Sequence, residues 1–257
     1  MIGLYYPRLG AWRVWQRNWD VSMKLWRVEL WPGFLEPVII LLAMGFGLGA
    51  FVQPIAGQSY LQFIAPGLVA SSAMFSATFE CTYGSFIRMT YQKTYDAILA
   101  TPLVVEDVIT GEVLWGATRA LFSGGVVLLV IAAFGLVQSP LALLVLPLLF
   151  LQGVTFSALA LLFTGLAPSI YTFNYYFTLF VTPLFFFSGI FFPLGQLPSV
   201  FQSVSWFTPL THVVDLYRSL VLGSLGWSLV VDLAWLIVAA GLFLAVSQAV
   251  MRRRLIV

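Results

Sequence analysis

Few side chains in this sequence could carry out acid–base or metal chemistry. His212 is the single histidine, and Asp215 and Arg218 follow it one helical turn apart, which could orient an imidazole. No G-x-S-x-G, H-E-x-x-H or cysteine–histidine pattern lies beside them, and Cys81 is the single cysteine. We therefore interpret this group as the polar side of a short helix, with an intramembrane enzyme as the less favoured alternative. No catalytic or metal-binding residue is predicted.

The sequence also lacks the pattern of a nucleotide-hydrolysing site. Its two lysines, Lys24 and Lys93, follow no G-x-x-x-x-G-K-[ST] pattern. The glycines of "GFGLGAF" (45–51) lack the G-x-G-x-x-G spacing, and Gly45 and Gly49 instead suit close helix packing. We predict that the chain is not an ATPase and holds no cofactor of its own.

Composition indicates that lipid surrounds most of the chain. Hydrophobic residues make up 61% and charged residues 9% of the 257 positions, whereas a soluble domain carries roughly 25% charged residues. The apolar residues form blocks of about 20, the length that crosses a hydrocarbon core. We predict an all-α polytopic membrane protein without a nucleic-acid partner, with residues 34–257 forming one six-span domain. The predicted spans are 34–53, 61–83, 113–137, 141–163, 171–192 and 229–250.

The distribution of basic residues predicts the orientation of these spans. Residues 1–33, the loop 84–112 and the tail at 252–254 hold nearly all of them, while the connections 54–60 and 138–140 hold none. By the positive-inside rule, both termini and the 84–112 loop are expected to be cytoplasmic.

Residues 1–33 are predicted to lie along the inner membrane interface. In "WRVWQRNWDVSMKLWRVELW" (12–31), Arg13 and Arg17 fall on one side of a helix, and Trp12 and Trp19 on the other. Tryptophan prefers the headgroup layer and arginine attracts anionic lipid, so these four residues are the expected interfacial anchor. An ordinary packed amphipathic helix is the alternative.

Four ionisable residues fall within or beside the predicted spans. Glu80 and Asp232 lie near the ends of spans two and six, and Glu112 and Arg119 lie two turns apart at the start of span three. They are candidates for ion pairs or gating. Because none is clearly central in the bilayer, a proton-coupled secondary transporter is a weaker alternative.

The stretch "IRMTYQKTYDAILATPLVVEDVITGE" (87–112) keeps both kinds of charge among apolar residues. Ile87, Tyr91, Tyr95 and Ile98 recur at helical spacing, and Thr101-Pro102 is expected to end the helix. The residues alone allow either a partner-binding helix or a helix that rests on the membrane.

Resemblance to a family favours the partner-binding helix. The stretches "YQKTYDAILATPL" (91–103), "GEVLWGATRA" (111–120) and "SGIFFPLGQLPSVFQSVSWFTPLTHVVDLYRSL" (188–220) resemble type-2 ABC exporter permeases, and among them the nodulation protein J and lipooligosaccharide-exporter branch. This resemblance implies a coupling helix at about 88–99 that contacts a separate ATPase. The implied contacts are Arg88, Gln92, Lys93, Tyr95 and Asp96.

The same resemblance implies the assembly and the cargo. It implies a homodimer with two ATP-binding subunits, which bind ATP and magnesium, in the inner membrane of a bacterium. Short outer helices at about 193–227, partly re-entrant, are implied between spans five and six. The implied cargo is a lipid-linked oligosaccharide or related amphiphile, with a drug or a polysaccharide as the alternative.

Aromatic residues in span five are candidates for the route of such a cargo. The segment "YTFNYYFTLFVTPLFFFSGIFF" (171–192) offers rings that can stack on sugars or accept acyl chains. Polar atoms in a span usually face protein or a cavity. The predicted pathway residues are Asn174, Tyr175, Thr178 and Phe185.

Overall fold

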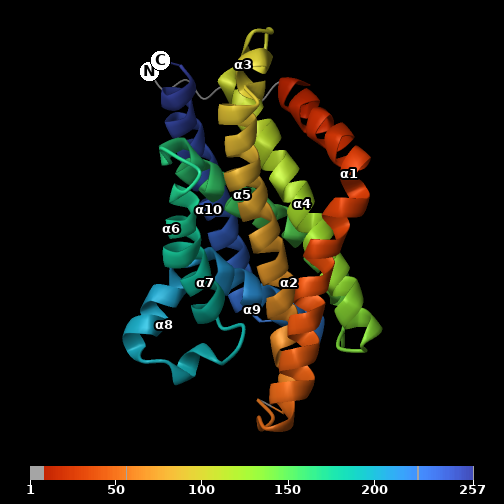
Figure 1. The fold of residues 1–257 in the computed structure, drawn as a ribbon. Coiled ribbons are helices and arrows are strands. Elements are labelled where there is room, and N and C mark those ends of the chain that lie inside the picture. The colour runs from red at the N-terminus through yellow and green to blue at the C-terminus, as the bar shows by residue number, and fades with distance from the viewer. Residues whose placement is uncertain (1–8, 56, 225, 257) are drawn as a thin grey trace.

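A computed structural model describes residues 9–55, 57–224 and 226–256, and these residues form an all-helical bundle (Figure 1). The all-helical class predicted from the sequence is confirmed. The α-helices are α1 (Leu9–Leu42), α2 (Tyr60–Phe79), α3 (Thr94–Leu99), α4 (Val105–Ala133), α5 (Val145–Leu166), α6 (Thr172–Tyr176), α7 (Thr182–Phe187), α8 (Ser199–Trp206), α9 (Pro209–Leu222) and α10 (Ser228–Leu255).

Shorter π- and 3₁₀-helical segments extend several of these helices. Two π-helical turns, Glu80–Gly84 and Ile87–Tyr91, prolong α2, and a third, Phe177–Val181, joins α6 to α7. A π-turn (Ala43–Gly47) and a 3₁₀ turn (Leu48–Ala50) follow α1, while 3₁₀ turns at Pro140–Leu144 and Leu194–Gln196 precede α5 and α8.

Four helices among the described residues are long and apolar enough to cross a membrane. They are Tyr60–Tyr91, Val105–Ala133, Pro140–Leu166 and Ser228–Leu255. Their starts carry ordinary signals: Ser59 and Gln62 form a capping box at α2, and Pro140 occupies the first turn before α5.

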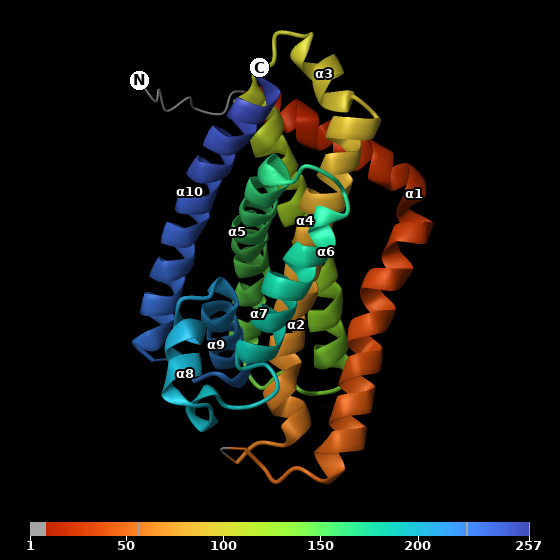
Figure 2. The ribbon, with the colours of Figure 1, turned by 60° about the vertical axis from the view of Figure 1, so that its left-hand side comes forward.

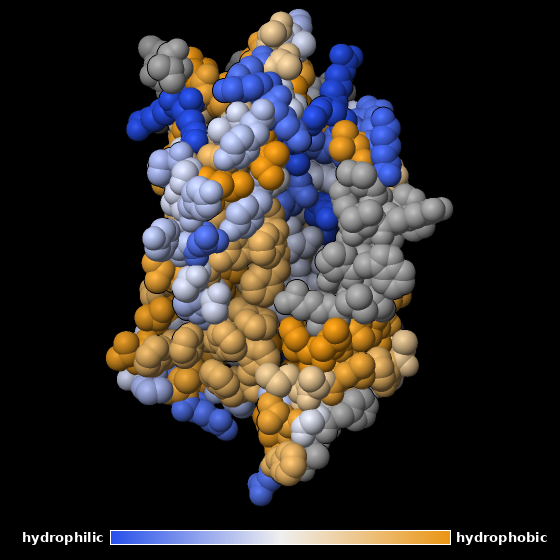
Figure 3. Space-filling view, viewed as in Figure 1, coloured by the Kyte–Doolittle hydropathy of each residue, from blue (hydrophilic) through white to orange (hydrophobic). Residues whose placement is uncertain are grey.

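The helix contacts order the bundle around α5. Helix α5 contacts α10 and α4, α4 contacts α1, and α2 packs against α4 and α5. Figure 2 shows α1 and α10 at opposite edges, with α6 and α7 forming one rod in front of the bundle. The start of α1, α3 and the end of α10 gather at one end, called here the α3 end, whereas α8 and α9 lie at the other, called the α9 end. Figure 3 shows hydrophilic residues gathered toward the α3 end, with hydrophobic surface below them.

Two segments differ from the boundaries expected from the sequence. A separate interfacial helix before a span at 34–53 was predicted, but α1 is one helix from Leu9 to Leu42, and it stays helical through Pro32, Gly33 and Pro37, where the sequence favours a break. The expected span 171–192 is helical only from Thr172 to Phe187, after which the chain turns at Gly189 with φ +77°. The side chains of Trp26, Arg27 and Glu36 lie outside the described residues, as do residues 1–8 of the predicted 1–33 segment.

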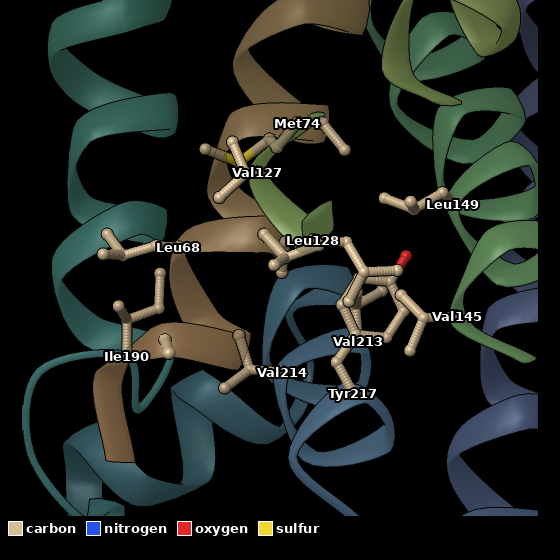
Figure 4. Close-up of a cluster of buried hydrophobic side chains, with 14 of the residues drawn as sticks. Leu68, Met74, Val127, Leu128, Val145, Leu149, Ile190, Val213, Val214 and Tyr217 are labelled. Atoms are coloured by element: carbon tan, nitrogen blue, oxygen red, sulfur yellow. The ribbon is translucent and has the colours of Figure 1, made fainter. Parts of the chain in front are cut away.

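The main hydrophobic core lies where α2, α4, α5 and α9 meet. Figure 4 shows Leu68 and Met74 of α2, Val127 and Leu128 of α4, Val145 and Leu149 of α5, and Val213, Val214 and Tyr217 of α9 in this cluster.

Two contacts fix the spacing of α5 against its neighbours. A Cβ added at Gly153 of α5 would lie 2.6 Å from the Cα of Ala117, so glycine permits the close approach to α4. The buried hydroxyl of Tyr217 in α9 donates to Oε1 of Gln152 at 2.7 Å, and Nε2 of Gln152 donates to the Ala70 carbonyl at 2.6 Å. This network ties α9 to α5 and α2 inside the core.

Candidate coupling site

Helix α3 projects from one end of the bundle as a short, separate helix. Lys93 adopts the left-handed conformation, φ +55°, which ends the prolonged α2 helix and lets α3 start in a new direction. The continuous helix predicted over 88–99 is therefore wrong: Arg88 belongs to the π-turn that prolongs α2, and α3 covers Thr94–Leu99. Figures 1 and 2 show α3 at the tip of the molecule, beyond the ends of its neighbours.

One side of α3 is exposed. Gln92, Lys93 and Asp96 are exposed, and Nζ of Lys93 lies 3.7 Å from Oδ2 of Asp96, with both side chains more than 60% exposed. An ion pair in such a position contributes little stability, because water screens it. These three predicted contact residues are thus accessible to another polypeptide.

The opposite side of α3 is anchored by Tyr95. Its side chain is 1% exposed and belongs to a buried cluster formed by the prolonged α2 helix, α4 and α5. Members of this cluster include Phe86, Met89, Val105, Val108 and Ile109. The prediction that Tyr95 contacts a partner directly does not match this burial; Tyr95 holds α3 on the bundle instead.

The Tyr95 hydroxyl has no hydrogen-bond partner within the described residues. Burial raises the pKa of this hydroxyl well above its usual range, and the nearby charge of Glu112 raises the pKa further. Tyr95 is therefore a neutral phenol that lies close to buried charges.

Those charges form a buried ion cluster made of Glu80, Arg88, Glu112 and Arg119. Nη1 of Arg88 lies 2.8 Å from Oε1 of Glu80, and Nη2 of Arg88 lies 2.5 Å from Oε2 of Glu112. Nε of Arg119 lies 3.6 Å from Oε2 of Glu80. The two acids and two bases balance, which suits a cluster that is largely removed from water.

Arg88 is accordingly buried, with its side chain 14% exposed, and does not offer a contact surface to a partner. This corrects its predicted role as a direct ATPase contact. The predicted pairing candidates Glu80, Glu112 and Arg119 do meet in one cluster, with Arg88 at its centre.

Glu112 is the most deeply buried member, at 1% exposed, and it joins three elements. Its Oε1 accepts from Nδ2 of Asn18 in α1 at 3.0 Å, and its Oε2 accepts from Oγ of Ser85 at 2.8 Å. The cluster therefore connects α1, the prolonged α2 helix and α4. Sequence reasoning missed Asn18 and Ser85; the signal for Asn18 was its place four residues after Val14 and four before Ser22, on the buried side of α1.

The first part of α1 packs against α4 rather than lying free of the bundle. A Cβ added at Gly111 of α4 would come within 2.8 Å of the Ala11 carbonyl oxygen, so the two helices are in close contact. Nε1 of Trp15 donates to Oγ1 of Thr118 at 2.9 Å, and the ring of Trp19 meets Trp115 edge-on. This part of α1 therefore packs on α4, and its position at the membrane interface stays a prediction.

The four predicted interfacial anchors lie at the surface of α1 to different degrees. Trp12 and Arg13 are exposed, while Arg17 and Trp19 are half-buried. Trp12 stacks on Trp15, with 4.3 Å between ring centroids, and Nη1 of Arg17 donates to Oδ1 of Asn18 at 2.9 Å. Arg17 therefore reaches the residue that contacts the buried ion cluster.

The predicted pathway residues do not converge on one point. Asn174, Tyr175 and Thr178 lie on the exposed side of the α6–α7 rod, where Oδ1 of Asn174 accepts from the Tyr83 hydroxyl at 3.1 Å. Phe185 is half-buried and packs edge-on against Phe75, with 5.4 Å between ring centroids.

Asp232 lies at the α9 end and is paired with His212. Nδ1 of His212 lies 2.7 Å from Oδ1 of Asp232, and Nε2 lies 2.7 Å from the Trp206 carbonyl oxygen. Nδ1 of His212 thus contacts Asp232 of α10, while Asp215 pairs with Arg218 at 3.5 Å. The less favoured alternative, in which Asp215 orients His212, named an acid other than the one that His212 contacts.

The comparisons with known proteins agree over most of the chain. The family model for "ABC-2 type transporter" matches residues 10–222. Nodulation protein J of Rhizobium leguminosarum bv. trifolii is 41% identical over 247 residues, covering 95% of this chain and 93% of that protein, and nodulation protein J of Sinorhizobium fredii is 39% identical over 243 residues with the same coverage. The inner membrane transport permease YadH of Escherichia coli is 27% identical over 253 residues, or 98% of each chain. The chain therefore belongs to the ABC-2 type transporter family, as the membrane permease subunit of an ABC exporter.

Proposed function

We propose that α3 is the coupling helix of this exporter and that its exposed side binds a separate ATP-hydrolysing subunit. Gln92, Lys93 and Asp96 provide both signs of charge and an amide on a projecting surface, a composition that suits a specific protein contact. The single observation that carries the proposal is the combination of this exposed side with a fully buried anchor, Tyr95, on the same six-residue helix.

Force on α3 would reach the spans through two routes. Tyr95 packs among side chains of α2 and α4, and its hydroxyl lies near the buried ion cluster. The connection from α3 to α4 is only residues 100–104, so α4 must follow α3 closely. ATP-driven closure of the partner would then shift α4, and with it α1, through Glu112 and Asn18.

The proposed assembly is a homodimer of this chain with two ATP-binding subunits. ATP and magnesium bind to those partner subunits, and this chain contributes no catalytic or cofactor site. The assembly lies in the bacterial inner membrane, with α3 and both termini on the cytoplasmic side, as the basic tail Arg252–Arg254 beside α3 supports.

Two further segments complete the proposed six spans. The later part of α1 and the α6–α7 rod run beside the four long apolar helices. The rod is continuous from Thr172 to Phe187, which is about 24 Å at 1.5 Å per residue and thus shorter than a typical hydrocarbon core. Helices α8 and α9 would then sit at the outer surface and shelter the end of this short span.

The proposed cargo is a lipid-linked oligosaccharide or related amphiphile. Tyr171, Tyr175 and Leu179 expose a continuous apolar side of the rod, which suits an acyl chain and a sugar moving along it. Asn174 and Thr178 add polar atoms to that side. A drug or a polysaccharide remains the alternative cargo for the same architecture.

The docking proposal is tested by reversing both charges on α3. The Lys93→Glu/Asp96→Lys variant should bind the ATP-binding subunit about tenfold more weakly or worse. Each reversed charge would then face a charge of the same sign on that subunit. Affinity is measured between the purified permease in nanodiscs and the ATP-binding subunit, and ATP hydrolysis is measured in the assembled complex.

The matched control is Ser203→Lys, which adds a charge to an exposed site on α8 at the opposite end. It should bind the ATP-binding subunit as the wild type does. Unchanged affinity of the α3 double variant, with the variant correctly folded in nanodiscs, would refute α3 as the docking helix.

A further inference from the structure

A cavity lined by both polar and apolar side chains lies at the α9 end, outside the coupling site. It has a volume of about 550 Å³, within the range of about 300–1,000 Å³ common for small-ligand pockets. Its walls come from α2, α8, α9 and α10, from the chain before α2 and from the link between α9 and α10. Helix α9 contacts both α8 and α10, and these helices lie at the end of the bundle opposite α3 (Figure 2).

The lining is rich in groups that both donate and accept hydrogen bonds. Hydroxyls come from Thr211, Ser219, Ser224 and Ser228, and a carboxamide comes from Gln58. Such a set matches a ligand whose own groups both donate and accept, as sugar hydroxyls do.

The first pair of charged groups in this cavity carries no net charge. The Trp206 carbonyl can only accept, so Nε2 of His212 carries a proton. The 2.7 Å contact between Nδ1 of His212 and Asp232 then needs a second proton between these two groups, since two lone pairs would repel at that distance. With both protons present, His212 and Asp232 are neutral as a pair.

The second pair is neutral as well. Nη1 of Arg218 lies 3.5 Å from Oδ1 of Asp215, and Nη2 of Arg218 donates to the Gly189 carbonyl at 2.7 Å. The guanidinium also lies over the Phe63 ring, 4.1 Å from its centroid. Nε of Arg218 has no hydrogen-bond partner among the described residues, but Asp215 compensates the charge of the guanidinium, so the cavity offers no uncompensated cation to a phosphate or carboxylate.

An aromatic surface stands at the same wall. Trp206 lines the cavity and is 50% exposed, so its indole ring has free apolar area beside the hydroxyl groups. A ring next to hydroxyls, an amide and a partly exposed carboxylate is suited to a saccharide, whose faces are apolar and whose edges are polar.

We infer that this cavity binds an uncharged saccharide unit, as a head-group site at the outer end of the permease. The inference rests on the proposed export of a lipid-linked oligosaccharide, and it adds a location and a charge selectivity to that proposal. The site takes neutral sugars in preference to phosphorylated ones, because its charges cancel and its free groups are hydroxyls and an amide.

The test measures saccharide binding by the permease in nanodiscs without any ATP-binding subunit. The probes are cellotetraose, maltotetraose and chitotetraose as neutral sugars, and glucose 6-phosphate as the anionic one, followed by saturation-transfer NMR and tryptophan fluorescence. At least one neutral tetrasaccharide should bind, and glucose 6-phosphate should bind more weakly than it.

Two variants locate the site. Asp215→Asn replaces a charged acceptor by a neutral amide and Ser228→Ala removes a hydroxyl, and each should weaken neutral-sugar binding by about fivefold. Ser203→Ala, on the exposed side of α8, is the control and should bind as the wild type does. Ser228 is exposed at the start of α10, so its replacement leaves the packing of the helix in place even if Asp215→Asn disturbs folding.

Failure of all neutral probes, tighter binding of glucose 6-phosphate, or wild-type affinity in both cavity variants would overturn the inference. These outcomes are independent of α3, because no ATPase is present. The two proposals can also fail separately. If the α3 double variant still binds the ATP-binding subunit normally while the permease binds neutral sugars, the coupling proposal is refuted and the cavity proposal stands.

Discussion

Replacing Arg88 by methionine removes the central cation of the buried ion cluster. Glu112 is 1% exposed and would keep only the donors from Asn18 and Ser85, while Glu80 would keep Arg119 at 3.6 Å. Breaking a buried ion pair by deleting one partner costs about 3–5 kcal/mol. Because Glu80 keeps a cation and Glu112 keeps two hydrogen-bond donors, we expect a loss of unfolding free energy at the low end of that range, about 3 kcal/mol.

Thermal unfolding in nanodiscs, followed by tryptophan fluorescence, measures this loss. For a chain of this size about 1 kcal/mol corresponds to a Tm change of about 2–4 °C, so Arg88→Met should melt about 6–12 °C below the wild type. Arg252→Met is the matched control, because Arg252 is 59% exposed and lies 3.4 Å from Glu106. An exposed pair of this kind contributes less than about 1 kcal/mol.

A double variant separates the charge effect from lost packing. Arg88→Met/Glu112→Gln removes both charges of the closest pair, so the buried anion that causes the loss is gone. We expect the double variant to recover at least about 1.5 kcal/mol relative to the sum of the two single changes. The reasoning fails if Arg88→Met melts like Arg252→Met, or if the two single losses simply add.

Three further substitutions test other contacts by the same melting measurement. Lys93→Gly should leave stability unchanged or raise it by up to about 1 kcal/mol, since glycine adopts φ +55° without strain; a clear loss would show that the lysine stem packs. Gly153→Ala should cost about 1–3 kcal/mol, because the new Cβ would lie 2.6 Å from the Cα of Ala117; wild-type stability would mean that α4 and α5 separate freely. Tyr217→Phe should cost about 1–3 kcal/mol by leaving Oε1 of the buried Gln152 unpaired, and a neutral effect would contradict the inter-helix network.

The sequence predicted the long helices because each is a separate apolar block. Tyr60 and Ser228 begin helices within one residue of the expected spans, whereas α4 begins at Val105, eight residues before the expected start at 113. Loop glycines such as Gly135 and Gly223 take positive φ values where helices end. The α6–α7 rod was overestimated because Phe191 and Phe192 extend the apolar run past Gly189, where the chain turns. Hydropathy cannot distinguish a buried turn from a helix.

The ion cluster was only half predictable. Glu112 and Arg119 were expected to matter because they sit in an apolar span, but the link from Glu80 to Arg88 was not. In a regular helix, residues eight apart lie about 80° away from each other around the axis. The π-turns at Glu80–Gly84 and Ile87–Tyr91 change that phase and bring the two side chains together. A sequence pattern interpreted with α-helical spacing alone does not predict such a pair.

The buried hydroxyl of Tyr95 has no hydrogen-bond partner among the described residues, which destabilises the observed position of α3. A buried hydroxyl without a partner costs about 1–3 kcal/mol, and Ser85 and Glu112 lie close enough to influence it. A small rotation of α3 that brought this hydroxyl into the ion cluster would recover that free energy. If α3 is the coupling helix proposed above, a partner that rotates it in this direction would gain up to that amount of free energy from one hydroxyl.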